Sequence, residues 1–192
     1  SEREFGADII IWPIQFTAAG NNLEELYGAI DGNTAKISEF LAGKGVDKKE
    51  ISFTTPSITD KSAQQYGNAK AEFRYTAQQT VTVYSKNIAI VQDVMRLLPE
   101  LGKTGIAFTG NNYQGQTDYI FTRLNKVKPE MIEEATRNAR EVAEKFAADS
   151  NSKLGKIRQA RQGQFSISAR DNNSPSIKKV RVVSTVEYYL SD

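Results

Sequence analysis

The feature that most constrains the fold is a repeated order in which one amphipathic helical segment is followed by two strand-like segments. Residues 23–41 carry apolar side chains at helical spacing, Asn22 is a suitable N-cap, and Gly43 is suited to the helix end. The same order recurs after the helical segments 88–98 and 129–148. The pattern predicts an α+β fold of three helix–strand–strand units, with a mixed or antiparallel sheet and helices packed on one face.

The strand segments differ in how clearly they are marked. Residues 8–18 are rich in Ile, Trp and Phe, and Pro13 inside them predicts an edge position or a bulge, because proline donates no ladder hydrogen bond. The polar segment 61–68 predicts a loop that leads into a long strand at 69–84. Alternating aromatic and polar residues predict a further strand at 118–126.

The third helix has the strongest signal. Pro129 is expected in its first turn, where a missing N–H costs little, and a cluster of glutamates at 130–134 is expected to interact with the helix dipole. Its expected buried stripe comprises Ile132, Ala135, Ala139, Val142, Ala143 and Phe146. A final hairpin is predicted from segments 155–169 and 178–190.

The length and composition limit the organisation and the chemistry. A chain of 192 residues fits one domain over 1–192, or two lobes that share a core, with a flexible start at 1–7. The chain has no Cys and no His, which excludes disulfides, zinc thiolate sites and Ser–His pairs. We therefore expect no cofactor, no metal and no enzymatic activity, while an enzyme of unrecognised type with a buried lysine stays open.

The most unusual charge feature lies near the C-terminus. Between residues 153 and 181 there are eight basic residues and one acidic residue, a local charge of +7 that leaves −5 for the rest of the chain. The candidate contacts to an anionic partner are Lys156, Arg158, Arg161, Lys178, Lys179 and Arg181.

Three interpretations of this basic hairpin stay open. The first is a charged edge that prevents strand-to-strand aggregation. The second is a contact to an acidic protein or to a second copy of the chain, and the third is a contact to an anionic surface such as lipid headgroups or polysaccharide. Nucleic acid is disfavoured, because only Phe165 lies among the basic residues as a stacking aromatic.

Several segments resemble, in order and spacing, the SIMPL-domain family of bacterial proteins of unknown function. The segments that carry the resemblance are Asp8 before the first strand, Gly45–Val46 leading into 51–56, the strand 75–83, the alanines at 135, 139, 143 and 147 followed by 154–157, and the ending at 180–190. The resemblance implies secreted, periplasmic or membrane-anchored proteins, some of them oligomeric. It implies no agreed catalytic residues, so none is transferred to this chain.

Together these observations predict a non-catalytic protein of the bacterial cell envelope, in the periplasm or anchored facing it. We expect a homo-oligomer that forms through the sheets and the charge-split surface. The longest apolar run, at 9–14, is too short to span a bilayer, so membrane association would require a segment absent from this chain. The main alternative is a module that binds an anionic envelope component through hairpin 156–181.

Overall fold

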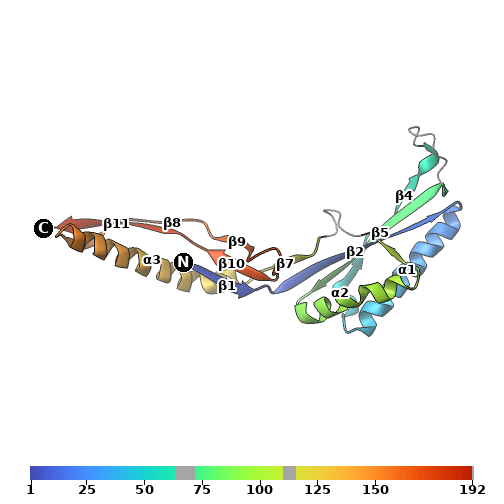
Figure 1. Cartoon of the computed structure of the whole chain (residues 1–192), viewed down its shortest axis with the longest axis horizontal. Helices are drawn as coiled ribbons and strands as arrows, with labels where there is room; N and C mark the ends of the chain where they lie inside the picture. The colour runs from blue at the N-terminus through green and yellow to red at the C-terminus, as the bar shows by residue number, and fades with distance from the viewer. Residues whose placement is uncertain (64–71, 110–115, 192) are drawn as a thin grey trace. The chain divides into compact units, whose positions relative to one another are not determined.

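The computed structural model describes residues 1–63, 72–109 and 116–191, and the chain divides into two compact units (Figure 1). Unit 1 contains Ser1–Asp8 and Ile120–Asp192, and unit 2 contains Ile9–Tyr119. Each unit has its own buried apolar cluster, and the two clusters share no residue. The expected common core is therefore replaced by two cores, because the first strand pairs with the C-terminal part of the chain while the second pairs within unit 2.

Unit 2 is built on an antiparallel sheet. Its strands are β2 (Ile9–Gly20), β3 (Ile51–Phe53), β4 (Ser57–Asp60), β5 (Tyr75–Ser85) and β6 (Ala107–Phe108). The strand order is β3-β5-β2-β6. In addition, β4 pairs with β5, and β7 (Asp118–Ile120) pairs with β2. The register of β2 on β5 is uninterrupted past Pro13, so there is no bulge. On the side of β2 away from β5, β6 pairs only with Phe16 and Thr17. Pro13 therefore has no partner on β6, which fits a residue that has no N–H to donate to a neighbouring strand.

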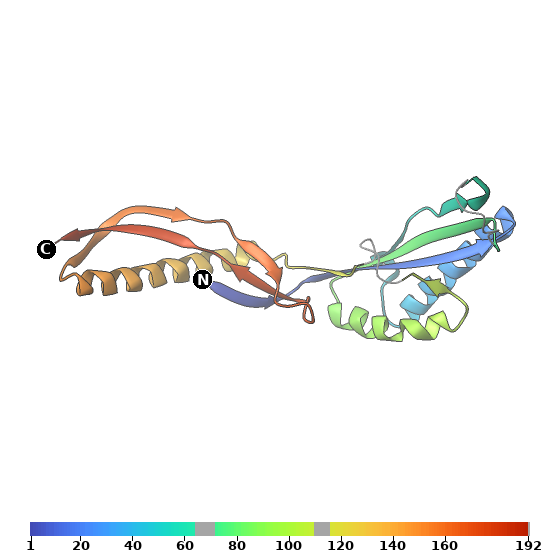
Figure 2. The same ribbon diagram turned by 45° about the horizontal axis from the view of Figure 1, so that its top comes forward.

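Two helices cover one side of this sheet (Figure 2). They are α1 (Leu23–Gly43) and α2 (Ile88–Gly102). The predicted N-cap is confirmed, because Asn22 Oδ1 accepts hydrogen bonds from the backbone N–H groups of Glu24 at 2.8 Å and Glu25 at 3.2 Å. Leu26, Ile30, Ile37 and Leu41 of α1 are buried against the strands, as the helical spacing of these residues predicts.

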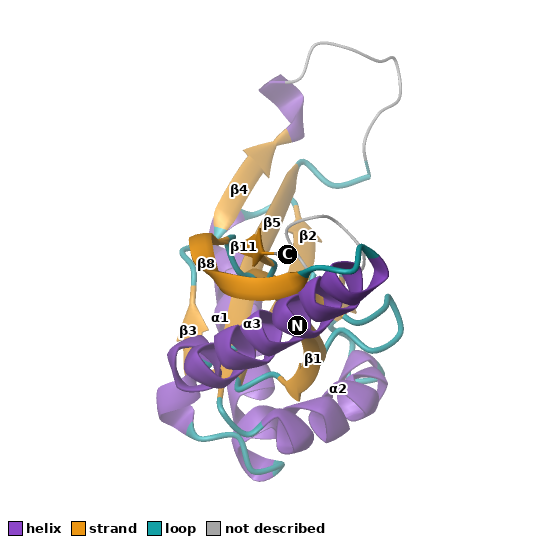
Figure 3. Cartoon of the chain, turned by 90° about the vertical axis from the view of Figure 1, so that its left-hand side faces the viewer, coloured by secondary structure: helices purple, strands orange, loops and turns teal. Residues whose placement is uncertain are grey.

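The α+β class and the antiparallel strands are thus confirmed, but the three helices do not share one sheet. Helix α3 (Leu124–Asp149) belongs to unit 1 and packs on β8 (Lys153–Gln162) and β11 (Ser184–Ser191), as Figure 3 shows. Most of the predicted loop at 61–68, and the start of the predicted strand at 69–84, lie outside the described residues.

The N-terminus of unit 1 is a strand, so the prediction of a flexible start was wrong. β1 (Glu2–Gly6) pairs antiparallel with β10 (Ile177–Arg181), which also pairs with β9 (Ser166–Ala169). Its alternation of charged and apolar side chains fits a strand with one buried face: Phe5 packs on the core of unit 1 and stacks on Phe121, with ring centroids 5.2 Å apart.

The predicted C-terminal hairpin is confirmed, with one interruption. β9 pairs with β10 next to the turn of the hairpin, and β8 pairs with β11 further from the turn. Between them, the backbone N–H of Gly163 donates to Val183 O at 2.8 Å.

Helix α3 differs from its prediction in two ways. It begins at Leu124 and not at Pro129, so the strand expected at 118–126 ends at Ile120. Along the expected buried stripe Ala135 is buried, but the side chains of Val142 and Phe146 are 50% and 71% exposed. The helix lies here against only two strands, β8 and β11, which are too narrow a surface to cover its whole apolar stripe.

Candidate functional site: the basic C-terminal hairpin

Three of the six predicted contacts, Lys178, Lys179 and Arg181, lie on β10. Val180 between them is fully buried, so Lys179 and Arg181, at alternate positions, belong to the face directed away from the core. The neighbouring strand β1 places Glu4 opposite Lys179 and Glu2 opposite Arg181. This face therefore carries acidic and basic side chains side by side.

Two basic residues of this region are paired with acidic residues of β1. Lys179 Nζ lies 3.2 Å from Glu2 Oε1, and Arg170 Nη1 lies 3.8 Å from Glu4 Oε2. Arg170 Nε also donates to Asp171 Oδ2 at 2.8 Å, which raises the pKa of Arg170 and lowers the pKa of Asp171. Of the three predicted contacts on β10, Lys179 thus already has an anionic partner in the chain's own first strand.

The opposite face of β1 is tied to α3 by a second charged group. Arg3 Nη1 lies 2.8 Å from Glu130 Oε1, and Arg3 Nη2 lies 2.6 Å from Glu134 Oε2. The hydrogen bond from Arg3 lowers the pKa of Glu134 despite an opposing effect of burial. Because α3 begins before Pro129, these glutamates lie beyond its first turn, and they hold β1 on the helix.

The other three predicted contacts, Lys156, Arg158 and Arg161, lie on β8 and are exposed. In the part of the chain that the structure describes, no ion pair involves any of them. With its amide oxygen turned toward Arg161, Gln159 accepts from Arg161 Nε at 2.9 Å and Nη2 at 3.0 Å. An amide orients this guanidinium without neutralising it, so the positive charges of β8 stay uncompensated among the described residues.

The charge division lies mainly inside unit 1. Unit 1 contains 15 basic and 12 acidic residues, a net charge of +3, and unit 2 contains 10 basic and 11 acidic residues, a net charge of −1. Because the hairpin segment 153–181 carries +7, the remainder of unit 1 carries −4. The acidic counterpart to the hairpin thus lies largely in the same unit, and β1 and α3 together supply half of this charge.

Large apolar side chains are exposed on the same elements that carry these charges. Phe146 and Val142 of α3 are 71% and 50% exposed, Ile157 of β8 is 50% exposed, and Leu190 of β11 is 56% exposed. We call these four residues the apolar surface of unit 1. The sequence analysis placed Phe146 and Val142 in the buried stripe of the helix. No sequence pattern indicated that only a narrow pair of strands would pack against this part of the helix.

Asp8, the first landmark of the family resemblance, has a structural role. Its Oδ2 accepts from the backbone N–H of Thr122 at 2.7 Å and from the Thr122 hydroxyl at 3.1 Å, and its Oδ1 pairs with Arg123. Partial burial opposes ionisation of Asp8, but the bonds from Thr122 and the charge of Arg123 outweigh it, so the pKa of Asp8 is lowered. Asp8 thereby fixes the end of β1 to the segment that leads into α3.

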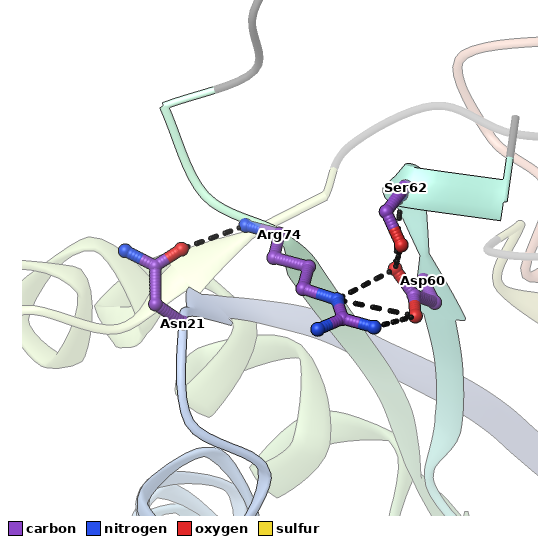
Figure 4. Close-up of polar contacts among 4 residues, drawn as sticks. All are labelled: Asn21, Asp60, Ser62 and Arg74. Carbon is purple, nitrogen blue, oxygen red and sulfur yellow. Dashed lines mark hydrogen bonds and ion pairs between the residues drawn. The ribbon is translucent and has the colours of Figure 1, made fainter. Parts of the chain in front are cut away.

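Figure 4 shows a compact polar cluster of unit 2. Arg74 donates to both carboxylate oxygens of Asp60, with Nη2–Oδ2 at 2.9 Å, and Ser62 donates to Asp60 Oδ1 from its backbone N–H at 2.9 Å and its hydroxyl at 2.7 Å. The bond from Arg74 is the largest cause that lowers the pKa of Asp60. The backbone N–H of Arg74 also donates to Asn21 Oδ1 at 2.9 Å. Since both charged groups are paired, the cluster acts as a structural clamp between β4 and β5.

The described residues contain no other group that suggests ion chemistry or a membrane span. Within residues 1–63, 72–109 and 116–191, no three Asp or Glu side chains are grouped so as to hold a metal ion. None of the helices in this part of the chain combines the length and the apolar character needed to cross a bilayer.

The model of the SIMPL family, described as a protein of unknown function (DUF541), matches residues 1–188. The chain belongs to this family. No curated protein matches it.

Proposed function

We propose that the protein is a non-catalytic component of the bacterial cell envelope that forms homo-oligomers through unit 1. The observation that carries the proposal is the apolar surface of unit 1, formed by Val142, Phe146, Ile157 and Leu190. Exposed apolar groups gathered on elements that pack together are typical of protein–protein contacts. The family resemblance supports a periplasmic location, or an anchored domain that faces the periplasm.

Charge supports the same surface as a contact between copies. β8 carries four basic residues without an ion-pair partner among the described residues, namely Lys153, Lys156, Arg158 and Arg161, and α3 next to it carries the acidic residues Glu133, Glu141 and Glu144. A second copy can therefore bring acidic helix residues to basic strand residues around an apolar centre. The absence of Cys and His from the sequence supports a non-catalytic role, because it removes the usual nucleophile and general base.

Analytical ultracentrifugation over a wide range of protein concentration tests this proposal. We expect a reversible monomer–oligomer equilibrium that Phe146→Ser weakens at least about tenfold, because it removes a central apolar group. Tyr84→Ser in unit 2 is the matched control, since that ring is also about half exposed (49%). A strict monomer at every concentration would refute self-association.

The charge contribution is tested in the same equilibrium. Replacing Lys156, Arg158 and Arg161 together with Gln is expected to weaken association at low salt and to reduce its salt dependence, because exposed charges are screened by salt. The control replaces Lys36, Lys44 and Lys49 of unit 2, which are also exposed. Equal effects of both triple variants would show that only net charge matters and would exclude β8 as the contact.

A second candidate function rests on the same three side chains of β8. Their lack of carboxylate partners among the described residues favours a module that binds an anionic envelope component. Retention on anionic vesicles and on an acidic polysaccharide should then be lost in the β8 triple variant and kept in the unit 2 triple variant. Retention unchanged by the β8 substitutions would rule this function out.

A further inference from the structure

A groove in unit 1 lies between α3 and the chain at Arg181–Val186. Its volume is about 760 Å³. Small and apolar side chains of one helix stripe, Ala135, Ala139 and Val142, line it from α3, and Ser1 and Glu2 also line it. The first strand of the unit therefore begins at this groove.

The strand on the other side of the groove has an unpaired edge. Ser1 and Val182 exchange both backbone hydrogen bonds, at 3.0 Å each. Val183 O accepts from Gly163 on the opposite edge, and the direction of the backbone groups alternates along a strand. The N–H and C=O groups of Ser184 and Val186 therefore point to the same edge as those of Val182.

β1 occupies this edge only as far as Ser1. Among the described residues, β11 has a strand partner only on the side of β8, so the backbone groups of Ser184 and Val186 face the groove without a strand to pair with. Such a row of free donors and acceptors is a template for an added strand.

A buried hydroxyl at the groove lacks a partner. The Oγ atom of Ser184 is buried and makes no hydrogen bond in the structure. A buried hydroxyl without a partner is unfavourable, and a strand in the groove would supply backbone donors and acceptors close to it. The side chains of Val142 and Val183, which also line the groove, are about half exposed (50% and 53%) and would be covered.

We propose that the groove is a slot for an extended peptide strand joined to the amine of Ser1, which lengthens β1 along β11. The register that pairs Glu2 with Arg181 and Ser1 with Val182 places the second residue ahead of Ser1 opposite Ser184 and the fourth opposite Val186. Directly opposed residues share a face, and Val186 is partly buried on the α3 side. The second and fourth residues therefore face α3 and should be apolar.

Continuity with β1 selects this occupant over a separate strand. The existing ladder already fixes the direction and register at Ser1, so an attached segment enters the slot at high effective concentration. A separate peptide or a second copy would have to take up the same place without this advantage.

Amide hydrogen exchange on extended chains tests the slot. Val-Thr-Val-Thr placed ahead of Ser1 puts valine at the second and fourth positions, and we expect exchange of the Ser184 and Val186 amides to slow by roughly tenfold or more. Thr-Val-Thr-Val has the same composition but turns its valines away from α3, so it should protect less. Val-Thr-Pro-Thr lacks the donor opposite Ser184 and should protect least. Equal exchange in all three extended chains and the unextended chain would overturn the proposal.

A substitution in the groove and two further measurements identify the occupant. Ala139→Glu retains a good helix former and fills the groove, so it should cancel the protection that Val-Thr-Val-Thr gives. Protection that survives this substitution would place the strand elsewhere and overturn the proposal. Equal protection by free Val-Thr-Val-Thr peptide would assign the slot to a separate chain. Protection of the unextended chain that grows with protein concentration would assign it to a second copy, and both results contradict an attached strand.

Discussion

The two units differ in how completely they bury their apolar residues. Among the described residues, sixteen buried side chains of unit 2 form one cluster between a sheet and two helices, whereas the cluster of unit 1 has five between one helix and narrow strand pairs. The difference is geometric, because a wide sheet covers the apolar stripes of two helices while two strands do not cover one long helix. Unit 2 thus has the larger buried cluster, and unit 1 has the two most exposed of the large apolar side chains mentioned above, Phe146 and Leu190, together with an unpaired strand edge.

The charges follow the same division. In unit 2 the polar cluster of Asp60 and Arg74 is closed on itself. In unit 1 Lys179 of β10 is paired with Glu2 of β1, whereas none of the basic residues on β8 has an ion-pair partner among the described residues. The comparison shows that, among the described residues of unit 1, the same helix and strands carry both exposed apolar groups and charged groups without ion-pair partners.

The strongest test of the comparison is a cavity in the core of unit 2. Phe16→Ala should lower the free energy of unfolding of this unit by about 3–5 kcal/mol, because the ring is fully buried. Urea unfolding followed by the fluorescence of Trp12, the single tryptophan and a member of the same core, measures it. Tyr84→Ala, at a half-exposed ring, is the control, and a loss as large as that of Phe16→Ala would contradict the assignment of the core.

An intermediate effect is expected in unit 1 at Asp8. Asp8→Asn should lower the free energy of unfolding of unit 1 by about 1–2 kcal/mol at neutral pH, because hydrogen bonds to a charged acceptor are lost. The lowered pKa means that the folded state holds the ionised form more strongly than the unfolded state does.

The contribution of Asp8 is therefore fully present above the pKa of the unfolded chain and is lost as the pH falls through the lower, folded pKa. The difference between the native protein and Asp8→Asn should shrink below about pH 4. Circular dichroism during urea unfolding at several pH values measures it. A difference that stays constant down to pH 2 would show that ionisation of Asp8 does not matter.

The smallest effect is expected at the apolar surface of unit 1. At a protein concentration that keeps the chain monomeric, Phe146→Ala should change the free energy of unfolding by less than about 0.5 kcal/mol, since the ring is mostly exposed. Met131→Ala on the same helix is the control and should cost about 2–4 kcal/mol, because Met131 is fully buried. Similar losses for both substitutions in urea unfolding would remove the distinction between core and surface on α3.

Local features of the fold were predictable from the sequence. The α+β class, the N-cap at Asn22, the buried face of α1 and the final hairpin all depend on spacing and on neighbouring residues, and all are confirmed. The start of α3 was not predicted, because Pro129 is a common first-turn residue and yet lies inside the helix here. The exposure of Phe146 was not predicted either, because helical periodicity gives the apolar face but not the width of the surface that covers it.

The candidate site was predictable only in part. The sequence identifies which residues are basic and places them on the two branches of one hairpin, and it could have suggested a strand at the N-terminus from the alternation of residues 2–5. It does not show that Glu2 and Glu4 lie beside Lys179 and Arg181, nor that Lys156, Arg158 and Arg161 are left without such neighbours.

The sequence by itself determined most of the secondary-structure elements and the family to which the chain belongs, and it contains neither Cys nor His. The tertiary structure alone decided that there are two cores, that Lys179 of the basic hairpin is paired by the first strand, and that a groove borders Ser1. The physical reason is the difference in sequence separation between the residues that interact. Helix caps and periodicity act over a few residues, whereas the pairing of β1 with β10 joins segments from opposite ends of the chain, and the local pattern of neither segment specifies its partner.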